Sequence, residues 1–225
     1  LANGPVTVPP RPDEQPLPLD AVLDTIHRIA PCGDACITLG GNGDALMYDQ
    51  LEAEIEAARD AGVFGIYLET DLLCDIAAVD QLLDWPIDAV GVRLNADTPE
   101  TYQLVMGVDA YKPVTRNLQH ALNTINGHEG SRAPDAPMGK PWIVPRLAKT
   151  DATVEEMEPF FDRWLTFAGH AVIEACPPGC ALDNGSMLRL SAPRAAMNPE
   201  FVSRCVLDAQ GALHRTEDDP AYALT

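Results

Sequence analysis

The sequence has few positively charged residues. Its 225 residues include 15 lysines and arginines against 34 aspartates and glutamates, which gives a formal net charge of −19 at pH 7. A surface with this balance does not neutralise phosphates, which argues against nucleic acid as a partner. The same balance argues against binding to an anionic membrane surface. An acidic excess serves solubility in general, so it does not by itself identify a ligand.

Long apolar runs, a signal peptide and paired histidines are also missing. No stretch approaches the roughly 18 apolar residues of a membrane span, and we expect a cytoplasmic protein. The five histidines are scattered and form neither an H-x-H nor an H-E-x-x-H metal motif. The first residue is Leu1 rather than Met, so we expect a processed protein or a piece of a longer one.

The cysteines are few, and their spacing does not match a common metal motif. Two pairs share a C-x-x-x-C spacing, Cys32 with Cys36 and Cys176 with Cys180. Zinc ribbons use C-x-x-C instead, so we predict no metal site and retain Cys176 and Cys180 as the candidates if a metal is found. Buried structural thiols, a metal or cluster role and disulfides all stay open as readings of the six cysteines.

What the sequence does contain is a repeated alternation of strand and helix patterns. Short apolar runs typical of strands occupy residues 36–39, 64–69, 89–94, 142–147 and 171–174. Helical spacing of apolar residues occupies residues 20–30, 48–61, 75–84 and 111–125, with further helices beginning near Thr98 and Thr153. This alternation predicts an α/β fold with a parallel sheet. We expect an incomplete (β/α) barrel, because one closing strand is missing.

Composition divides the chain into three parts. Six prolines among residues 1–18 predict an extended N-terminal segment. The barrel is expected over residues 19–176, and residues 177–225 form a small irregular C-terminal extension. A late strand pair is expected in that extension, at residues 203–208 and 212–215. Within the barrel, Pro145 interrupts a strand pattern, which predicts a bulge or the end of a barrel at that point.

A glycine-rich stretch, Ile37 to Leu46, follows the first strand pattern. It holds Gly40, Gly41 and Gly43 around Asn42 and is closed by Asp44. Glycines at a strand's end let the backbone turn with positive φ and approach a ligand closely. It is not a dinucleotide fingerprint, because the third glycine of G-x-G-x-x-G is missing, and no Gly-Lys-Ser/Thr follows as in a P-loop. A tight turn without a ligand is the alternative.

Polar residues gather where the predicted strands end. In barrels of this kind, function lies at the C-terminal ends of the strands. These ends contain Gly40 to Asp44, Glu69 to Asp71, Arg93 and Asn95, Arg146 and Lys149, and Glu174 with Cys176. Arginines at such positions suit a carboxylate or phosphate ligand. A salt bridge to a neighbouring strand-end carboxylate is the alternative for each arginine.

Several segments, in order and spacing, resemble radical S-adenosylmethionine (SAM) enzymes of the SPASM type. Ile37 to Leu46 is similar to their "GGE" motif, Phe64 to Asp71 to their third strand, and Ala89 to Tyr102 to the "tpetY" segment. Ser203 to Asp219 resembles the SPASM extension. The resemblance covers roughly residues 19–219 and implies a partial TIM-type barrel.

The resemblance also implies cofactors and site residues. It places SAM on the glycine-rich loop, with Gly40, Gly41 and Asp44 at the methionyl amino group and Asn42 and Gly43 in the same loop. It places Arg93, Asn95 and Arg146 near the ribose or carboxylate. It further implies a [4Fe-4S] cluster, which would perform the reductive cleavage of SAM, and a peptide or small-molecule substrate.

The chain departs from that family at several positions. The C-x-x-x-C-x-x-C loop that holds the cluster is absent, and Thr216 falls where the extension's cluster cysteine belongs. Asp44 stands for the usual Glu and Arg93 for the usual Ser. Arg93 therefore either fills the ribose position or neutralises Asp44, and in the second case the site is a closed ion pair.

Three functional hypotheses follow. The chain is a portion of a radical SAM/SPASM enzyme whose cluster ligands lie upstream of Leu1. Alternatively, it is a cluster-less barrel that acts as a binding or partner subunit without catalysis. The third hypothesis is an unrelated barrel hydrolase that uses Asp44, Glu69, Asp71 and His170.

Overall fold

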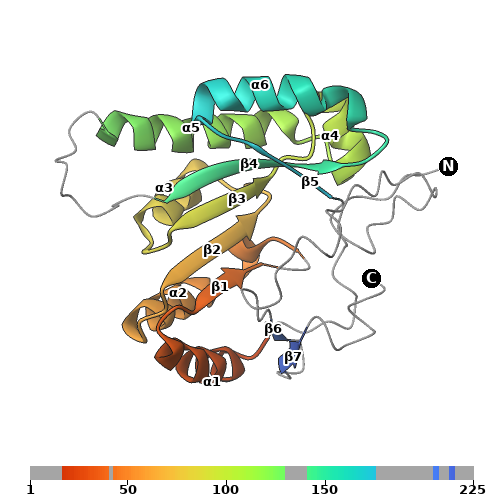
Figure 1. Cartoon of the computed structure of the whole chain (residues 1–225). Helices are drawn as coiled ribbons and strands as arrows, with labels where there is room; N and C mark the ends of the chain where they lie inside the picture. The colour runs from red at the N-terminus through yellow and green to blue at the C-terminus, as the bar shows by residue number, and fades with distance from the viewer. Residues whose placement is uncertain (1–16, 41–42, 130–140, 176–204, 208–212, 216–225) are drawn as a thin grey trace.

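The computed structural model of the chain describes residues 17–40, 43–129, 141–175, 205–207 and 213–215. These residues form an α/β fold in which strands and helices alternate (Figure 1). The strands of the main sheet are β1 (Cys36–Leu39), β2 (Gly65–Thr70), β3 (Ala89–Arg93), β4 (Trp142–Lys149) and β5 (Val172–Ala175). The α-helices are α1 (Leu19–Ile29), α2 (Leu51–Asp60), α3 (Ile76–Asp84), α4 (Pro99–Met106), α5 (Tyr111–Glu129) and α6 (Met157–Ala168).

The main sheet is entirely parallel, as predicted. Its strands lie in the order β1-β2-β3-β4-β5, and its registers pair Leu39 with Leu68 and Arg93 with Arg146. When consecutive parallel strands are neighbours, right-handed crossovers bring the connecting helices to one side of the sheet. Figure 1 shows the described α-helices on that side of the sheet, and none of them covers the other face. The five strands do not close into a barrel.

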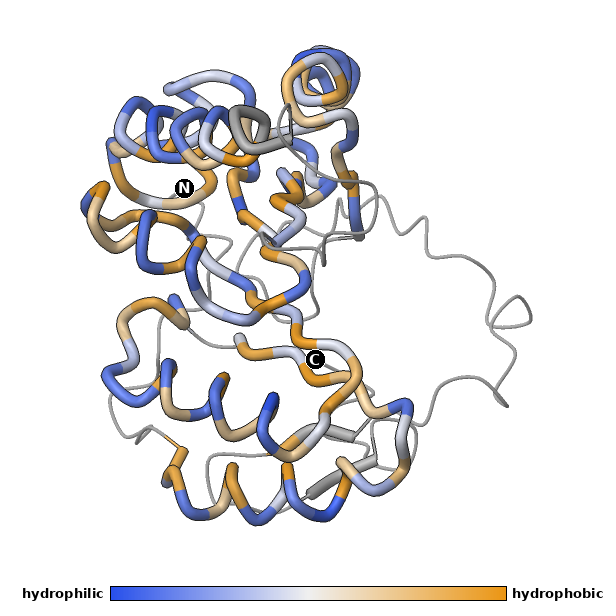
Figure 2. Tube along the Cα trace, turned by 90° about the vertical axis from the view of Figure 1, so that its left-hand side faces the viewer, coloured by the Kyte–Doolittle hydropathy of each residue, from blue (hydrophilic) through white to orange (hydrophobic). Residues whose placement is uncertain are grey.

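The core lies between the sheet and these helices. Ile66 and Leu68 alternate with half-buried residues along β2, and Val90 and Val92 flank Gly91 on β3; each of these four apolar residues is at most 1% exposed. The helices bring apolar stripes to the same layer, and Trp164 of α6 is among the largest buried side chains. Figure 2 shows the resulting alternation of hydrophilic and hydrophobic residues along the helices. Burial of each large apolar side chain contributes about 1.5–3 kcal/mol.

Several helices begin at different residues from those predicted. The helix expected over residues 48–61 begins at Leu51, because a separate 3₁₀ turn (η2, Ala45–Met47) comes first and Asp44 caps it. Helix α6 likewise follows a 3₁₀ turn (η3, Val154–Glu156). Helix α1 starts at Leu19, one residue before the predicted start, with Pro18 at the cap position. Helix α4 begins beside Thr98 as predicted, and the Thr98 side chain accepts a hydrogen bond from the Thr101 amide.

Pro145 lies inside β4, where we predicted a bulge or a barrel end. It pairs with Val92 in a regular parallel register. The amide of Trp142 donates to Asp88 on the β3 side. Amides alternate along a strand, so the position of the proline nitrogen faces the β5 side. Pairing with β5 begins only at the next residue, Arg146. The N–H that proline lacks would point toward β5 at a residue where β4 and β5 are not yet paired. The proline therefore removes no hydrogen bond between the two strands.

The late strand pair is confirmed within the described residues. Strands β6 (Cys205–Leu207) and β7 (Leu213–Arg215) pair antiparallel. Residues 1–16 of the predicted N-terminal segment and most of the predicted extension over residues 177–225 lie outside the described residues. Among the helices that the structure describes, none has the length and apolar character needed to cross a membrane.

Candidate functional site

One face of the sheet, which we call the open face, carries polar side chains on every strand from β2 to β5. Tyr67 and Glu69 project from β2, Arg93 from β3 and Arg146 from β4, and each is only partly buried. Because strands β2 to β5 are parallel and in register, the charged members gather near the C-terminal ends of the strands. This is the edge at which the sequence placed the functional residues.

The described part of the glycine-rich loop is shaped by close approach and by positive φ. A Cβ at Gly40 would lie 2.9 Å from the Cβ of Glu69, so only glycine allows β1 and β2 to approach this closely. Gly43 has φ +91°, which favours glycine. The predicted ligand contacts at Gly41 and Asn42 fall outside the described residues.

Asp44 stabilises the loop, because each of its carboxylate oxygens accepts a backbone hydrogen bond. Oδ1 accepts a hydrogen bond from the Leu46 amide and Oδ2 accepts one from the Asp71 amide, both at 3.1 Å. The first bond caps η2, and the second ties the loop to the end of β2. Asp44 therefore has a structural role in this arrangement, in addition to the ligand contact that the resemblance implies.

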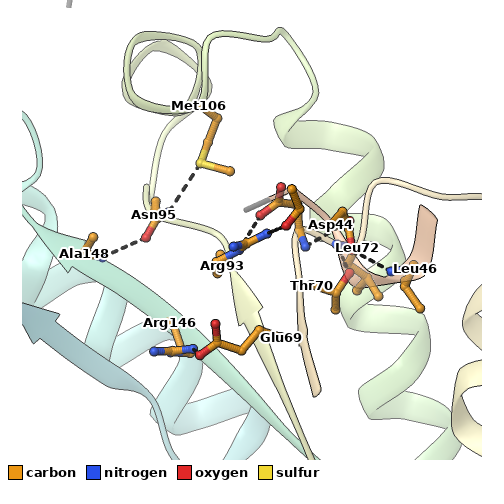
Figure 3. A network of polar contacts seen from close by, with 12 residues as sticks. Asp44, Leu46, Glu69, Thr70, Leu72, Arg93, Asn95, Met106, Arg146 and Ala148 are labelled. Atoms are coloured by element: carbon orange, nitrogen blue, oxygen red, sulfur yellow. Dashed lines mark hydrogen bonds and ion pairs between the residues drawn. The ribbon is translucent and has the colours of Figure 1, made fainter. Parts of the chain in front are cut away.

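Arg93 of β3 contacts both the glycine-rich loop and the residue that follows β2. Its Nε donates to Asp71 Oδ1 at 2.8 Å, and a terminal nitrogen donates to the Gly43 carbonyl at 2.6 Å. Both side chains of the ion pair are mostly buried, at 15% and 17% exposure. Figure 3 shows the Arg93 side chain between Asp44 and the pair formed by Arg146 and Glu69. The ion pair joins Arg93 to Asp71, whereas the sequence analysis left open the ribose position of SAM or neutralisation of Asp44.

Asp71 has a perturbed pKa. The pKa is raised to about 6 as the net result of burial, which raises it most, the guanidinium of Arg93, which lowers it, and the nearby carboxylates of Asp44 and Glu69, which raise it. Burial and carboxylate repulsion therefore outweigh the single cation. The consequence is a carboxylate that gains a proton in mildly acidic solution, beside the arginine that pairs with it.

The second arginine lies between two carboxylates. Arg146 pairs with Glu69 of β2 through one terminal nitrogen and with Glu174 of β5 through the other. Its guanidinium also lies 5.8 Å from the ring centre of Tyr67, within the range of a cation–π contact. Burial lowers the pKa of Arg146, but its bonds to both glutamates raise the pKa more, so the group stays charged.

Gly91 makes room for this second group. A Cβ at this position would lie 1.9 Å from the Tyr67 hydroxyl and 2.9 Å from Cδ of Arg146. The side chains of Tyr67 and Arg146 therefore extend over β3 at Gly91, where no side chain is in the way. The sequence reasoning missed Tyr67 and Gly91. The available signal was a glycine inside a strand pattern, which often marks a close approach.

Asn95 uses its side chain inside the protein. It is 2% exposed and has φ +54°. Its Oδ1 accepts a bond from the Ala148 amide at 2.8 Å, and its Nδ2 lies 3.4 Å from the sulfur of Met106. These contacts fasten the end of β3 to β4 and α4, beside the predicted ligand position.

The hydrolase hypothesis is not supported by the positions of its residues. His170 lies before β5, where it contacts the Ile143 carbonyl at 3.0 Å and stacks near Trp142. Ile143 is near the start of β4. His170 is therefore at the N-terminal ends of the strands, and Asp44 and Asp71 are at the C-terminal ends.

Within the described ranges, no three histidine, cysteine, aspartate or glutamate side chains are arranged to hold a metal ion. Cys32, Cys36 and Cys74 are free thiols. The candidates Cys176 and Cys180 lie outside those ranges. A comparison with models of protein families finds no match, and no curated protein is significantly similar to the chain.

Proposed function

We propose that this chain is an incomplete (β/α) barrel of the radical SAM/SPASM type whose open face binds a cationic small molecule or peptide without carrying out the radical reaction. The observation that carries the proposal is the charge of this face. Among the described residues at this edge, Asp44, Glu69, Asp71 and Glu174 outnumber Arg93 and Arg146, so these four carboxylates and two guanidiniums have a net charge of −2 when all are ionised. The cytoplasm remains the expected compartment.

The shape and chemistry of the open face favour an organic cation. Tyr67 projects from β2 on this face, two residues before Glu69, and its ring lies 5.8 Å from the Arg146 guanidinium. Aromatic surface beside carboxylates attracts a cation that also has an apolar body. Strands in sequential order with helices on one side support the barrel part of the proposal.

The described thiols do not fit a [4Fe-4S] cluster. Cys32 and Cys36 lie at the N-terminal end of β1. At about 3.3 Å per residue, Cys36 is about 13 Å from Gly40 along the strand. Cys74 follows β2 at the other end of the sheet. These thiols do not converge on one point, so the proposal includes no step at a cluster.

The residues around the loop also do not fit the methionyl group of SAM as they stand. Both oxygens of Asp44 accept backbone N–H groups, and the Gly43 carbonyl accepts from Arg93. An ammonium group would have to displace Arg93 to reach Gly43 and Asp71. This supports a binding role without SAM chemistry.

A second candidate is a portion of a radical SAM/SPASM enzyme that obtains its cluster ligands from residues upstream of Leu1. The order and spacing of the resembling segments favour it. Calorimetric titration of SAM into the chain and into Asp44→Asn separates the two candidates. The binding role predicts no measurable SAM binding in either protein. SAM binding that Asp44→Asn weakens by about 10- to 100-fold supports the enzyme instead.

The binding role is tested with cationic probes. Agmatine, spermidine and the peptide Gly-Lys-Gly amide are titrated at about 0.15 M salt, where long-range attraction is screened. At least one is expected to bind saturably, and Glu174→Gln is expected to weaken it about 10-fold by removing one charge from the open face. Asp24→Asn removes the same charge from the exposed surface of α1 and serves as the control. Equal weakening by both variants, or no binding, contradicts the proposal.

A further inference from the structure

Helices α5 and α6 lie side by side on the covered side of the sheet (Figure 1), and a groove lies between them. Its volume is about 390 Å³. It is lined by Gln119, Leu122, Asn123, Thr166 and Phe167. The volume falls within the range of small-molecule sites, which is about 300–1,000 Å³. We propose that this groove binds a neutral sugar ring. The site is separate from the open face and does not depend on cation binding there.

The spacing of residues on the two helices brings the lining together. Gln119 and Asn123 are four residues apart on α5, so both side chains lie on the same side of that helix. They are exposed, whereas Leu122 between them is 7% exposed and is the buried member of the lining. Thr166 and Phe167 are consecutive residues of α6. The groove is therefore polar and exposed along α5 and partly aromatic along α6.

The lining of the groove carries no charge. Its members are two amides, one hydroxyl, one leucine and one phenylalanine, although 22% of the chain consists of charged residues. An ionic ligand would lose hydration here without gaining an ion pair with the lining. The groove therefore suits a neutral ligand, in contrast to the carboxylate-rich open face.

The polar side chains of the groove offer donors and acceptors to a ligand. Gln119 and Asn123 each provide an amide NH₂ that donates and an amide oxygen that accepts. Within the described part of the chain, neither side chain is engaged in a hydrogen bond. Thr166 Oγ1 donates to the Asp162 carbonyl at 2.9 Å, so it presents its lone pairs as an acceptor. Ligand hydroxyl groups, which both donate and accept, match such a set.

Phe167 provides an aromatic surface beside these polar groups. It is 54% exposed, and its ring centre lies 6.3 Å from that of Trp164. Trp164 is 1% exposed and packs against Phe160, so it supports the Phe167 ring from the core side. A supported ring loses little freedom when a ligand binds. A sugar ring combines apolar C–H faces with hydroxyls around its edge, and the groove combines an aromatic ring with amides and an acceptor.

Saturation-transfer difference NMR with the full chain tests the site. The probes are the methyl glycosides of D-glucose, D-galactose and D-mannose. Acetylglycine N-methylamide, which mimics a peptide backbone, represents the other neutral polar ligand. At least one glycoside is expected to bind saturably with a millimolar Kd. Because the ligand is neutral, its Kd is expected to change less than about twofold between about 0.05 M and about 0.5 M NaCl.

Variants of the lining locate the binding. Phe167→Ala is expected to weaken glycoside binding at least about 10-fold. Thr166→Val keeps the shape of the side chain and removes its acceptor, and Asn123→Ala removes one amide. Each is expected to weaken binding about fivefold, as the loss of one neutral hydrogen bond implies. Phe161→Ala is the matched control, because Phe161 is a 39% exposed phenylalanine of the same helix that does not line the groove. It is expected to leave the Kd unchanged.

The sugar site is overturned if no glycoside binds saturably, or if Phe161→Ala weakens binding as much as Phe167→Ala does. Tighter binding of acetylglycine N-methylamide than of every glycoside assigns the groove to a peptide backbone and also overturns it. Circular dichroism establishes that each variant is folded. If Phe167→Ala does not fold, the exposed positions Thr166 and Asn123 decide the outcome. An unchanged Kd in both Thr166→Val and Asn123→Ala then counts against the site.

Discussion

At the scale of single residues, the surroundings of a carboxylate decide its role. Asp44 was predicted to meet a ligand, and in the fold both of its oxygens accept backbone amides. Glu54 is 5% exposed, whereas Glu52 on the same helix is exposed. The reason is its place on the α2 stripe at three residues from Leu51 and four residues from Ala58, which are both buried.

Glu54 provides a prediction of pH dependence. Its pKa is raised to about 7, because burial raises it more than a hydrogen bond with Tyr48 lowers it. Because the folded pKa lies above the unfolded value of 4.5, the stabilising contribution is complete below that value and is lost as pH rises to about 7. The loss is at most about 3 kcal/mol. Glu54→Gln should reduce the fall in unfolding free energy between pH 5 and pH 8, measured by urea denaturation. Exposed Glu56→Gln is the control, and equal pH profiles for both variants would show that Glu54 is not responsible.

At the scale of elements, the three central strands form a unit because β3 has a glycine, Gly91, in the middle of its open face. Glycine inside a strand ordinarily weakens it by roughly 0.5–1 kcal/mol. Here the absence of a side chain at Gly91 lets Tyr67 of β2 and Arg146 of β4 meet across β3. That contact joins strands that are not neighbours in the sheet, which backbone pairing alone does not do.

Gly91→Ala tests this unit. The added Cβ collides with the Tyr67 hydroxyl, so we expect destabilisation of roughly 1–3 kcal/mol in chemical denaturation. The same change in a Tyr67→Ala background should cost much less, because the collision is gone. A double-mutant cycle measures the difference as a coupling energy. Additive effects of the two substitutions would mean that the close approach does not limit this position.

At the scale of the whole molecule, charge is the dominant feature. The net charge of −19 makes the folded chain repel itself at low ionic strength. The ion pairs of the open face are mostly buried, so salt screens them less than it screens the surface.

Salt should therefore stabilise the fold. We expect Tm to rise between about 0.01 M and about 0.15 M NaCl, where the screening length falls from about 30 Å to about 8 Å. Differential scanning calorimetry measures the change, with sucrose at matched osmolality as the control for general exclusion effects. A Tm that falls with NaCl would mean that surface ion pairs contribute more than the repulsion.

The sequence by itself determined the element order and the parallel sheet. Apolar periodicity is a local property of the chain, and short alternating strand and helix patterns allow few arrangements other than a parallel sheet. It also located the charged residues at the strand ends, Arg93 and Arg146 among them. The regular place of Pro145 within β4 was not accessible in this way, because it depends on where β5 begins to pair.

Only the tertiary structure decided which charges neutralise each other. Arg93 pairs with Asp71 and donates a hydrogen bond to the Gly43 carbonyl, and Arg146 forms ion pairs with both Glu69 and Glu174. These partners are far apart in the chain and are brought together by strand register and by the bare backbone of Gly91. A sequence pattern shows which residues reach one edge of a sheet. The distances between their side chains, which set ion pairing and pKa, follow from how the strands pack.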